Sequence, residues 1–348
     1  MANNKDTTNN MLGDERLDPN AQLLVVDNLH VEFRIEDGVV KAVNGLSYTL
    51  DEHETLAILG ESGSGKSVSA QAVMGILDTP PGFVTQGSVA FRGVDLLQLP
   101  EKVMAKEVRG QKIAMIFQDA LTALNPVFTV GWQISEMFRK HRGMSKKEAK
   151  VQAIDLMERV RIPDAPQRYS GYPHEFSGGM RQRAMIAMAL SLDPDVLIAD
   201  EPTTALDVTV QAQIMELLHD LQKDTGMGLI LITHDLAVVA EVCDRVVVMY
   251  AGEIMEDGEI NDVYHHPAHP YTLGLMDSIP RTDMHIDRLT PIQGAPPDLL
   301  NIPSGCPFHP RCPYAQPRCS QDKIERVRIG QAEHESSCFY WEEVQRDI

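Results

Sequence analysis

Residues 60–67, which read GESGSGKS, constrain the fold of this chain more than any other stretch. The apolar run at 55–59 predicts a buried strand before them, and the apolar spacing over 68–77 predicts a helix after them. A strand, a glycine-rich loop ending in Gly-Lys-Ser and a helix, in this order, form the phosphate-binding P-loop pattern. The alternative is a glycine-rich turn with a chance Gly-Lys-Ser, and the flanking strand and helix argue against it. The segment therefore predicts an α/β fold that binds a nucleotide.

Each residue type in this loop suits the binding of phosphate groups. Glycines let the backbone curl so that its N–H groups point at phosphate oxygens, and the start of the helix adds a partial positive charge. We expect Lys66 to place its ammonium against the outer phosphates and Ser67 to offer its hydroxyl to Mg²⁺. The predicted nucleotide-binding residues are Gly60, Glu61, Ser62, Gly63, Ser64, Gly65, Lys66 and Ser67.

The length of the chain bounds the number of domains, and its net charge argues against some classes of binding partner. A chain of 348 residues is long for one hydrophobic core, so two domains or one elaborated domain is expected. The net charge of −19 disfavours non-specific binding of nucleic acid, which needs a basic surface. Residues 1–20 are polar and lack the layout of a signal peptide, so we expect a disordered tail there. No apolar run has the length of a membrane-spanning helix, so an association with the membrane would go through a partner.

Strand patterns lie on both sides of the P-loop. Residues 23–35 and 39–50 predict a hairpin with its turn at an Asp-Gly pair. Two interpretations of Phe33, at the end of the first of these strands, stay open. Its ring could stack on an adenine base, or it could be an ordinary core or edge aromatic residue. Further strands are expected at 85–91 and 113–117.

Helical spacing replaces the strand pattern over residues 119–170, directly after Gln118. Helices are expected at 130–141 and 145–160, and the whole segment is interpreted as a helical insertion between strands of the nucleotide-binding core. A hydroxyl and exposed amides before a helix form a second layout suited to phosphate, or alternatively an ordinary helix start. This layout is found at Ser177, Gly178 and Gly179.

Two buried strands later in the chain end in residues with chemical function. The strand at 196–199 leads into Asp200 and Glu201, and the strand at 228–233 leads into His234. In α/β proteins, ligands bind at the C-terminal ends of parallel strands. Asp200 suits the binding of Mg²⁺ through water, Glu201 suits general-base catalysis, and His234 suits a contact with a γ-phosphate. The alternation of strands and helices predicts a mainly parallel sheet with helices on both faces.

Together these motifs resemble the nucleotide-binding subunit of ABC transporters, over about residues 23–264. The resemblance rests on GESGSGKS, the loop at Gln118, FSGGMRQR at 176–183, LIADE at 197–201, the loop at 205–207 and His234. It implies a P-loop NTPase of the ABC cassette type, with a mainly parallel sheet core, an antiparallel β subdomain and an inserted α-helical subdomain. The cassette is accordingly expected at 21–265, with its helical subdomain at about 119–185.

The resemblance also implies roles for individual residues. Hydrolysis of ATP would use Glu201 as general base, Asp200 as support for Mg²⁺, and Gln118 as a sensor of Mg²⁺ and the attacking water. The cassette would work as a head-to-tail heterodimer with a second ATPase subunit, and Asp207 would cross the interface. One departure from the general pattern is Met180, which stands where Gln is most common. ATP bound to the partner would be covered by Ser177, Gly178 and Gly179.

The C-terminal part of the chain resembles the extension of importer ATPases of the oligopeptide, dipeptide and nickel class. FSGGMRQR at 176–183 together with MYAGEIMEDG at 249–258 most resembles the D-type subunit of oligopeptide permeases. The segments that match the extension are 266–281, 294–297 and 305–315. A C-terminal domain is therefore expected at 266–348. The resemblance implies a peripheral ATPase that powers uptake of oligopeptides at the cytoplasmic face of the bacterial inner membrane. Its implied partners are two transmembrane permeases and an extracytoplasmic peptide-binding protein.

Other functions stay open at this point. Dipeptides or nickel are alternative substrates within the same class. A soluble ABC ATPase of DNA repair or translation is a second hypothesis, and the acidic charge argues against it. An iron–sulfur carrier with a vestigial cassette is a third hypothesis. The complete set of cassette residues argues against a vestigial site, namely Lys66, Asp200, Glu201 and His234.

Four cysteines fall in the C-terminal segment, at Cys306, Cys312, Cys319 and Cys338. Four thiolates suit a tetrahedral zinc ion or a [4Fe–4S] cluster. The close Cys-x-x-Cys pairs usual in zinc ribbons are absent, so the spacing does not choose zinc. Members of the resembled class carry a [4Fe–4S] cluster in this extension, and the resemblance therefore favours a cluster. Zinc, with His309 as a substitute ligand, and free thiols in a packed tail are the alternatives.

Overall fold

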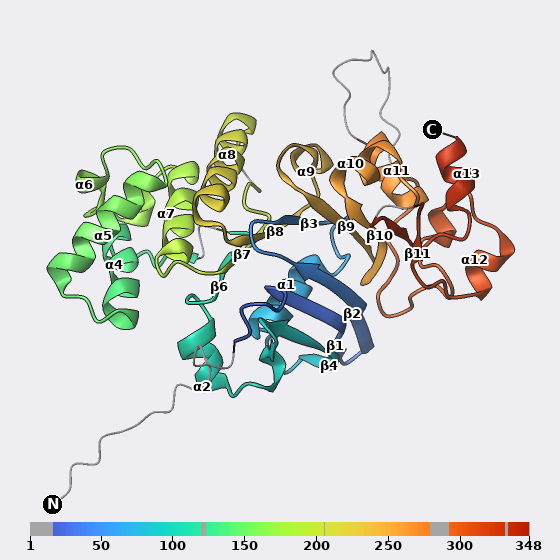
Figure 1. Cartoon of the computed structure of the whole chain (residues 1–348), viewed down its shortest axis with the longest axis horizontal. Helices are drawn as coiled ribbons and strands as arrows, with labels where there is room; N and C mark the ends of the chain where they lie inside the picture. The colour runs from blue at the N-terminus through green and yellow to red at the C-terminus, as the bar shows by residue number, and fades with distance from the viewer. Residues whose placement is uncertain (1–16, 120–122, 205, 279–291, 331–332, 348) are drawn as a thin grey trace, which may run out of the picture.

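The computed structural model describes residues 17–119, 123–204, 206–278, 292–330 and 333–347. The expected disordered tail lies outside these residues over 1–16, as does Ala205 of the loop at 205–207. The described residues form two β-sheets, with a group of helices at one end of the molecule and the C-terminal elements at the other (Figure 1).

The smaller sheet is antiparallel and contains the predicted hairpin. Ile35 pairs with Gly38 across the loop of the hairpin. The third strand begins earlier than the predicted start at 85, because its first residues still pair with the end of the hairpin, where Phe33 lies opposite Gly82. The strands, in sheet order, are β2 (Gly38–Leu50), β1 (Leu24–Ile35), β4 (Gly82–Phe91) and β5 (Val94–Asp95).

The larger sheet has the strand order β11-β12-β10-β9-β3-β8-β7-β6. The strands from β9 to β6 run parallel, as predicted, and β10, β12 and β11 extend the sheet in antiparallel fashion. The parallel strands are buried almost throughout, which explains their continuous apolar sequences. The strands of the larger sheet have the bounds β3 Thr55–Leu59, β6 Ile113–Ile116, β7 Val196–Asp200, β8 Gly228–Thr233, β9 Arg245–Tyr250, β10 Glu253–Glu259, β11 Val327–Arg328 and β12 Glu335–Ser336.

The predicted helical segment forms α4 (Val130–His141), α5 (Lys146–Arg159) and α6 (Ala165–Arg168). Hydroxyl caps begin the first two of these helices, since Thr129 accepts from the backbone N–H of Trp132, and Ser145 forms a capping box with Glu148. The other helices are α1 Lys66–Met74, α2 Glu101–Val103, α7 Gly178–Leu190, α8 Val208–Thr225, α9 Leu236–Val242, α10 Ile260–His265, α11 Pro270–Asp277, α12 Pro317–Gln321 and α13 Trp341–Arg346. Short helical turns lie at 96–98, 104–108, 173–175 and 309–311.

Alternate residues of the parallel strands enter two separate cores, because successive side chains of a strand point to opposite faces. In β3, Leu56 and Ile58 pack with α1 and the smaller sheet. Ala57 and Leu59 pack in the core that contains α4, α7, α8 and α9. The helix that follows the P-loop therefore lies between the two sheets, and helices cover both faces of the larger sheet.

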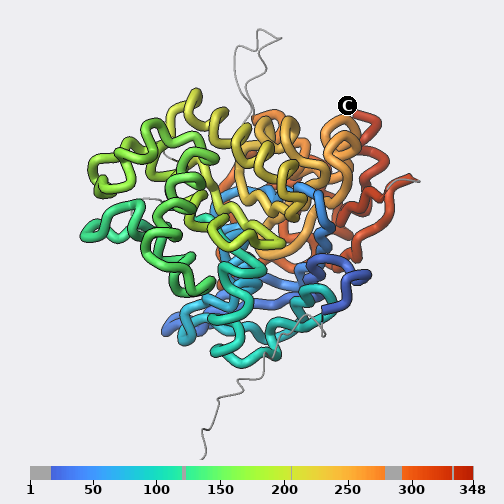
Figure 2. The backbone as a smooth tube through the Cα atoms, turned by 60° about the vertical axis from the view of Figure 1, so that its left-hand side comes forward, coloured from blue at the N-terminus to red at the C-terminus, as the bar shows by residue number. Residues whose placement is uncertain are grey.

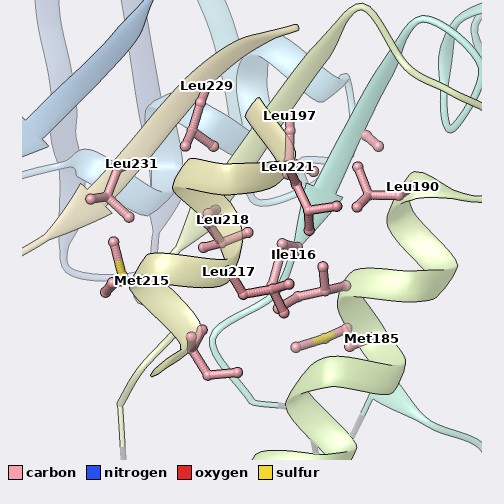
Figure 3. Packing of buried hydrophobic residues seen from close by; sticks show 14 of the residues in the cluster. Ile116, Met185, Leu190, Leu197, Met215, Leu217, Leu218, Leu221, Leu229 and Leu231 are labelled. Atoms are coloured by element: carbon pink, nitrogen blue, oxygen red, sulfur yellow. The ribbon is translucent and has the colours of Figure 1, made fainter. Parts of the chain in front are cut away.

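Apolar residues of α8 pack against the larger sheet. Leu217, Leu218 and Leu221 recur at helical spacing on α8 and are buried. Figure 3 shows them facing Leu229 and Leu197 of β8 and β7, with Met185 and Leu190 of α7 beside them. This packing holds the strands whose ends carry Asp200, Glu201 and His234.

The C-terminal residues pack on the antiparallel edge of the larger sheet. β12 pairs with β10 at Glu256↔Ser336, and Tyr271 and Phe308 are buried in the same core as β9. Figures 1 and 2 show this region beside β10 and α11, on the side away from α4 and α5. None of the described helices has both the length and the apolar character required to cross a membrane.

Candidate functional site

The P-loop joins β3 to α1, and two of its glycines lie against neighbouring backbone. A Cβ atom at Gly65, where φ is +101°, would lie 2.2 Å from the carbonyl oxygen of Ala42 on β2. A Cβ atom at Gly60 would lie 2.2 Å from the carbonyl oxygen of Met249 on β9. A side chain at either position would push the loop away from the strands that support it.

Lys66 is the first residue of α1, and its ammonium lies inside the loop. Nζ donates to the carbonyl oxygen of Gly60 at 2.7 Å and to that of Glu61 at 2.9 Å. Burial lowers the pKa of this ammonium, and the carboxylates of Glu201 and Asp200 oppose the shift. The ammonium therefore lies against two backbone carbonyl oxygens of the loop, and it can bind phosphate oxygens in their place.

Ser67 and Asp200 meet at the adjacent strand end. The Ser67 hydroxyl donates to Oδ1 of Asp200 at 2.9 Å, and Asp200 is almost completely buried. Burial raises the pKa of the Asp200 carboxyl, and the hydrogen bond from Ser67 opposes the shift. A hydroxyl and a carboxylate are hard oxygen ligands of the kind that Mg²⁺ prefers, so the two residues fit a magnesium site.

Glu201 follows β7 in a strained backbone conformation, with a φ of +44°. Its N–H donates to the carbonyl oxygen of Ile232 at 2.9 Å, which ties the residue to β8. Non-glycine residues adopt this left-handed region at an energetic cost, and such residues cluster at functional sites. The strained backbone of Glu201 therefore marks the end of β7 as a functional site.

Three side chains surround the carboxylate of Glu201. Oε2 accepts from Nε2 of Gln118 at 2.9 Å and from the hydroxyl of Thr204 at 2.8 Å. Nδ1 of His234 lies 3.5 Å from Oε1. Gln118 follows β6 and His234 follows β8, so the parallel strands bring together residues that the sequence could only place at separate strand ends. This arrangement can hold a water molecule at Oε1 and accept its proton.

Sequence reasoning missed some of the residues at this site. Thr204 donates to the Glu201 carboxylate, and the only indication of this contact in the sequence is that Thr204 lies three residues after Glu201. Tyr271 and Arg311, from the C-terminal region, both contact Glu61 in the P-loop. No local pattern in the sequence connects either residue with the loop.

The predicted residues of the α7 start form a second group, next to the start of α8. Ser177 is exposed and caps α7 by accepting from the N–H of Met180, and Asp207 caps α8 in the same way at Val210. A Cβ atom at Gly179 would lie 2.7 Å from the side chain of Val210, so the two helix starts pack closely. Gly178 and Asp207, at these two helix starts, are both exposed.

Phe33 lies on an interior strand of the smaller sheet, not on an edge strand. Its ring is half-buried against the core of that sheet and packs against Gly82, where an added Cβ atom would lie 3.0 Å from the ring.

The prediction of a [4Fe–4S] cluster at Cys306, Cys312, Cys319 and Cys338 is wrong, and so is the zinc alternative. Within the described residues, which include all four cysteines, no group of three or more His, Cys, Asp or Glu side chains is arranged to hold a metal ion. Burial raises the pKa of the Cys306 thiol to about 11 and those of Cys312 and Cys338 to about 12. Buried neutral thiols behave as small apolar groups in a protein core.

The surroundings of these cysteines agree with that correction. Cys306 and Cys312 pack against the main hydrophobic core, and the N–H of Cys306 donates to the carbonyl oxygen of Cys319. Nδ1 of His309, the predicted substitute ligand, lies 2.9 Å from the backbone oxygen of Cys306. None of these four cysteines forms a disulfide bond in the described part of the chain.

Both parts of the chain are similar to known protein families. The family described as ABC transporter matches residues 43–204, and that described as oligopeptide/dipeptide transporter, C-terminal region, matches residues 255–319. The dipeptide transport ATP-binding protein DppD of Bacillus subtilis is 52% identical over 310 residues, which are 89% of this chain and 91% of that protein. The oligopeptide transport ATP-binding protein OppD of Escherichia coli is 52% identical over 298 residues, which are 86% of this chain and 88% of that protein.

Solved structures resemble the fold. A dimeric ATP-binding cassette in a post-hydrolysis state, bound to ADP and Pi, matches with a TM-score of 0.61 and 26% identity, over 68% of this chain and 98% of that one. A part of an ABC transporter complex from Clostridium perfringens matches with a TM-score of 0.60 and 29% identity, over 70% of this chain and 90% of that one.

Proposed function

This chain belongs to the family of ABC-transporter ATP-binding subunits for oligopeptides and dipeptides, and we propose that it hydrolyses ATP to power uptake of oligopeptides across the bacterial inner membrane. The observation that carries the proposal is the meeting of Ser67 with Asp200, and of Gln118 with Glu201 and His234, at one end of the sheet. The relatives are peptide transport proteins, so neither DNA repair nor translation is favoured.

We assign the chemical step to Glu201. Its carboxylate takes a proton from the water whose oxygen bonds to the γ-phosphorus, while the bond from that phosphorus to the bridging oxygen breaks. Gln118 and Thr204 bind Oε2, which leaves Oε1 for the water. His234, whose Nδ1 lies 3.5 Å from Oε1, would contact the γ-phosphate.

The remaining loop residues bind the nucleotide in this proposal. The loop amides at 60–67 and the ammonium of Lys66 hold the phosphates. Mg²⁺, when bound, neutralises phosphate charge, and Ser67, Asp200 and Gln118 are its proposed contacts. Gln118 stands between this site and the helical segment that follows it, so it can report the state of the site to α4 and α5.

The test is Glu201→Gln, which keeps the shape and the two hydrogen-bond donors to the side chain but removes the base. The rate of ATP hydrolysis should fall about 10²- to 10⁴-fold, while ATP still binds. Glu216→Gln is a matched control, since the exposed Glu216 carboxylate pairs with Arg161, which has no assigned role in the site. Hydrolysis at the wild-type rate in Glu201→Gln would contradict the assignment of the base.

We also propose that the chain works as a head-to-tail heterodimer with a second ATPase subunit. Ser177, Gly178 and Gly179 would cover ATP on the partner, and Asp207 would cross the interface. The exposure of this surface supports the proposal, because the apolar side chain of Val208 is 82% exposed there. Asp207→Arg should weaken ATP-dependent association of the two subunits in sedimentation velocity. Unchanged association would argue against this interface.

We propose a cassette at 21–265, with a helical subdomain at about 119–185, and a cysteine-rich extension at 266–348. The family match at 255–319 supports the second part. Two transmembrane permeases and an extracytoplasmic peptide-binding protein are the proposed partners, at the cytoplasmic face of the membrane. Co-expression tests this assembly. The chain should appear in the membrane fraction with the permeases and leave it without them, and equal recovery without them would contradict the proposal.

We propose that Phe33 stacks on the adenine base. The partial exposure of this aromatic residue supports the proposal. Phe33→Ala should raise the Kd of ATP by about fivefold or more, because base stacking is worth about 1–3 kcal/mol. An unchanged Kd in a fluorescence titration would leave Phe33 as a residue of the core only.

A further inference from the structure

The C-terminal region reaches the nucleotide-binding loop through Arg311, whose side chain is only 6% exposed. Its guanidinium forms a bidentate pair with Glu61, from Nη1 to Oε2 at 2.6 Å and from Nη2 to Oε1 at 3.1 Å. Nη1 also donates to the hydroxyl of Tyr250 at 3.2 Å, and Nε donates to the carbonyl oxygen of Gln293 at 3.0 Å. The planar fork of the guanidinium is therefore fixed on a P-loop residue.

Tyr271 of α11 makes a second contact with the same residue. Its hydroxyl accepts from the backbone N–H of Glu61 at 2.8 Å. The ring is fully buried, with its centroid 4.7 Å from that of Tyr250 and 5.2 Å from that of Phe308. Because this aromatic packing fixes the ring, the position of the hydroxyl is fixed as well.

Glu61 is thus held at each of its three polar groups. Arg311 binds its carboxylate, Tyr271 accepts from its N–H, and its carbonyl oxygen accepts from the Lys66 ammonium at 2.9 Å. The two C-terminal contacts are therefore made on the residue whose carbonyl oxygen accepts from the ammonium of the loop. A displacement of the C-terminal region would move this carbonyl.

We propose that Arg311 and Tyr271 are positioning residues for ATP, which hold the first half of the P-loop in its binding shape and couple the C-terminal region to nucleotide affinity. The inference rests on the proposed function, because it requires ATP at this loop. A loop that is already ordered binds without the entropy cost of ordering it. The loss should fall on binding and not on the chemical step, because both contacts are made at Glu61 and not at Glu201.

The experiment measures ATP hydrolysis by the chain assembled with its partner subunits, and ATP binding to the full chain by fluorescence titration. Tyr271→Phe removes only the hydroxyl and keeps the buried ring, while Arg311→Gln removes the fork. Each should raise KM and Kd for ATP about five- to tenfold, with kcat changed less than about twofold. Arg311→Lys keeps the charge without the fork and should restore part of the affinity. Arg318→Gln, which breaks an exposed pair with Asp322 in the same region, is the control and should leave KM unchanged.

A double-mutant cycle tests whether Arg311 acts through Glu61. In a Glu61→Gln background, Arg311→Gln should cause no further loss of ATP affinity, because the pair is already broken. The inference is overturned if the losses of ATP affinity in Glu61→Gln and Arg311→Gln add up in the double variant. It is also overturned if both Arg311→Gln and Tyr271→Phe bind ATP with wild-type affinity. If Arg311→Gln does not fold, as judged by circular dichroism, Tyr271→Phe decides. Failure of the wild-type chain to bind ATP would instead overturn the proposed function.

Discussion

The buried carboxylate of Glu256 joins β10 to the C-terminal region, and its replacement by glutamine should weaken this attachment. The side chain is 0% exposed. Oε1 accepts from the N–H of Ala268 at 2.7 Å and lies 2.7 Å from Nε2 of His334, and Oε2 accepts from the N–H of His269 at 3.0 Å. Glu256→Gln keeps the volume but turns one of the two acceptor oxygens into a donor.

The free-energy cost follows from these contacts. With the amide nitrogen in the position of Oε2, the N–H of His269 loses its acceptor, which costs about 1–3 kcal/mol. The two bonds to Oε1 change from charge-assisted to neutral and weaken by about 1 kcal/mol each. A neutral amide is less costly to bury than a carboxylate, which offsets about 1 kcal/mol. The net destabilisation of the C-terminal attachment should therefore be about 2–4 kcal/mol.

Hydrogen exchange followed by mass spectrometry measures this attachment locally. Peptides covering 253–270 and 333–340 should exchange about 30- to 1,000-fold faster in Glu256→Gln, as a loss of about 2–4 kcal/mol requires. Glu335→Gln, on the neighbouring strand, removes a half-exposed pair with Arg326 at 3.4 Å and should change exchange very little. Wild-type exchange in Glu256→Gln would refute the claim that this carboxylate holds the region in place.

Two further predictions concern the P-loop and the response to acid. Gly65→Ala should abolish ATP binding and lower the free energy of unfolding by about 2–4 kcal/mol, because the left-handed backbone is strained and the new Cβ overlaps the carbonyl oxygen of Ala42. Gly63→Ala, whose Cβ would meet nothing within 4 Å, should lower the free energy of unfolding by only about 1 kcal/mol. Urea unfolding measures the stability of both variants, and nucleotide titration measures their ATP binding. Burial lowers the pKa of His269 from 6.5 to about 3, and its Nδ1 accepts from the N–H of Tyr271, so the folded chain keeps the ring neutral. The unfolded chain binds this proton below about pH 6.5, so stability should fall as the pH drops towards 3, by about 1.4 kcal/mol at pH 5.5, and His269→Asn should remove that part of the pH dependence in urea unfolding.

Local patterns account for what could be predicted from the sequence. The P-loop, the start of α4 at Val130 and the whole of β8 agree with their predicted positions, because glycine spacing, helix caps and continuous apolar runs act over a few residues. The same signals placed Asp200 and Glu201 at a strand end. They could not specify the strand order, which brings Gln118 within 2.9 Å of Glu201 across 83 positions of the chain.

The cysteines show where sequence reasoning failed. Four thiols in one segment suit a metal by count, but ligation also depends on how the side chains are arranged around one point. The tertiary structure sets how the side chains are arranged, and within the described residues no group of three or more potential ligands is arranged to hold a metal ion. The sequence spacing of Cys306, Cys312, Cys319 and Cys338 carries no information about that arrangement.

The sequence by itself determined that this chain binds a nucleotide, carries parallel strands and has the motifs of a transport ATPase. Only the tertiary structure decided that the C-terminal region extends the large sheet through β12 and reaches the P-loop, where Arg311 pairs with Glu61 across 250 positions. The physical reason is the distance along the chain over which each kind of interaction acts. Backbone propensities and side-chain periods act between near neighbours, whereas a contact between distant residues forms only when the burial of both cores has fixed the strand order and the position of every loop.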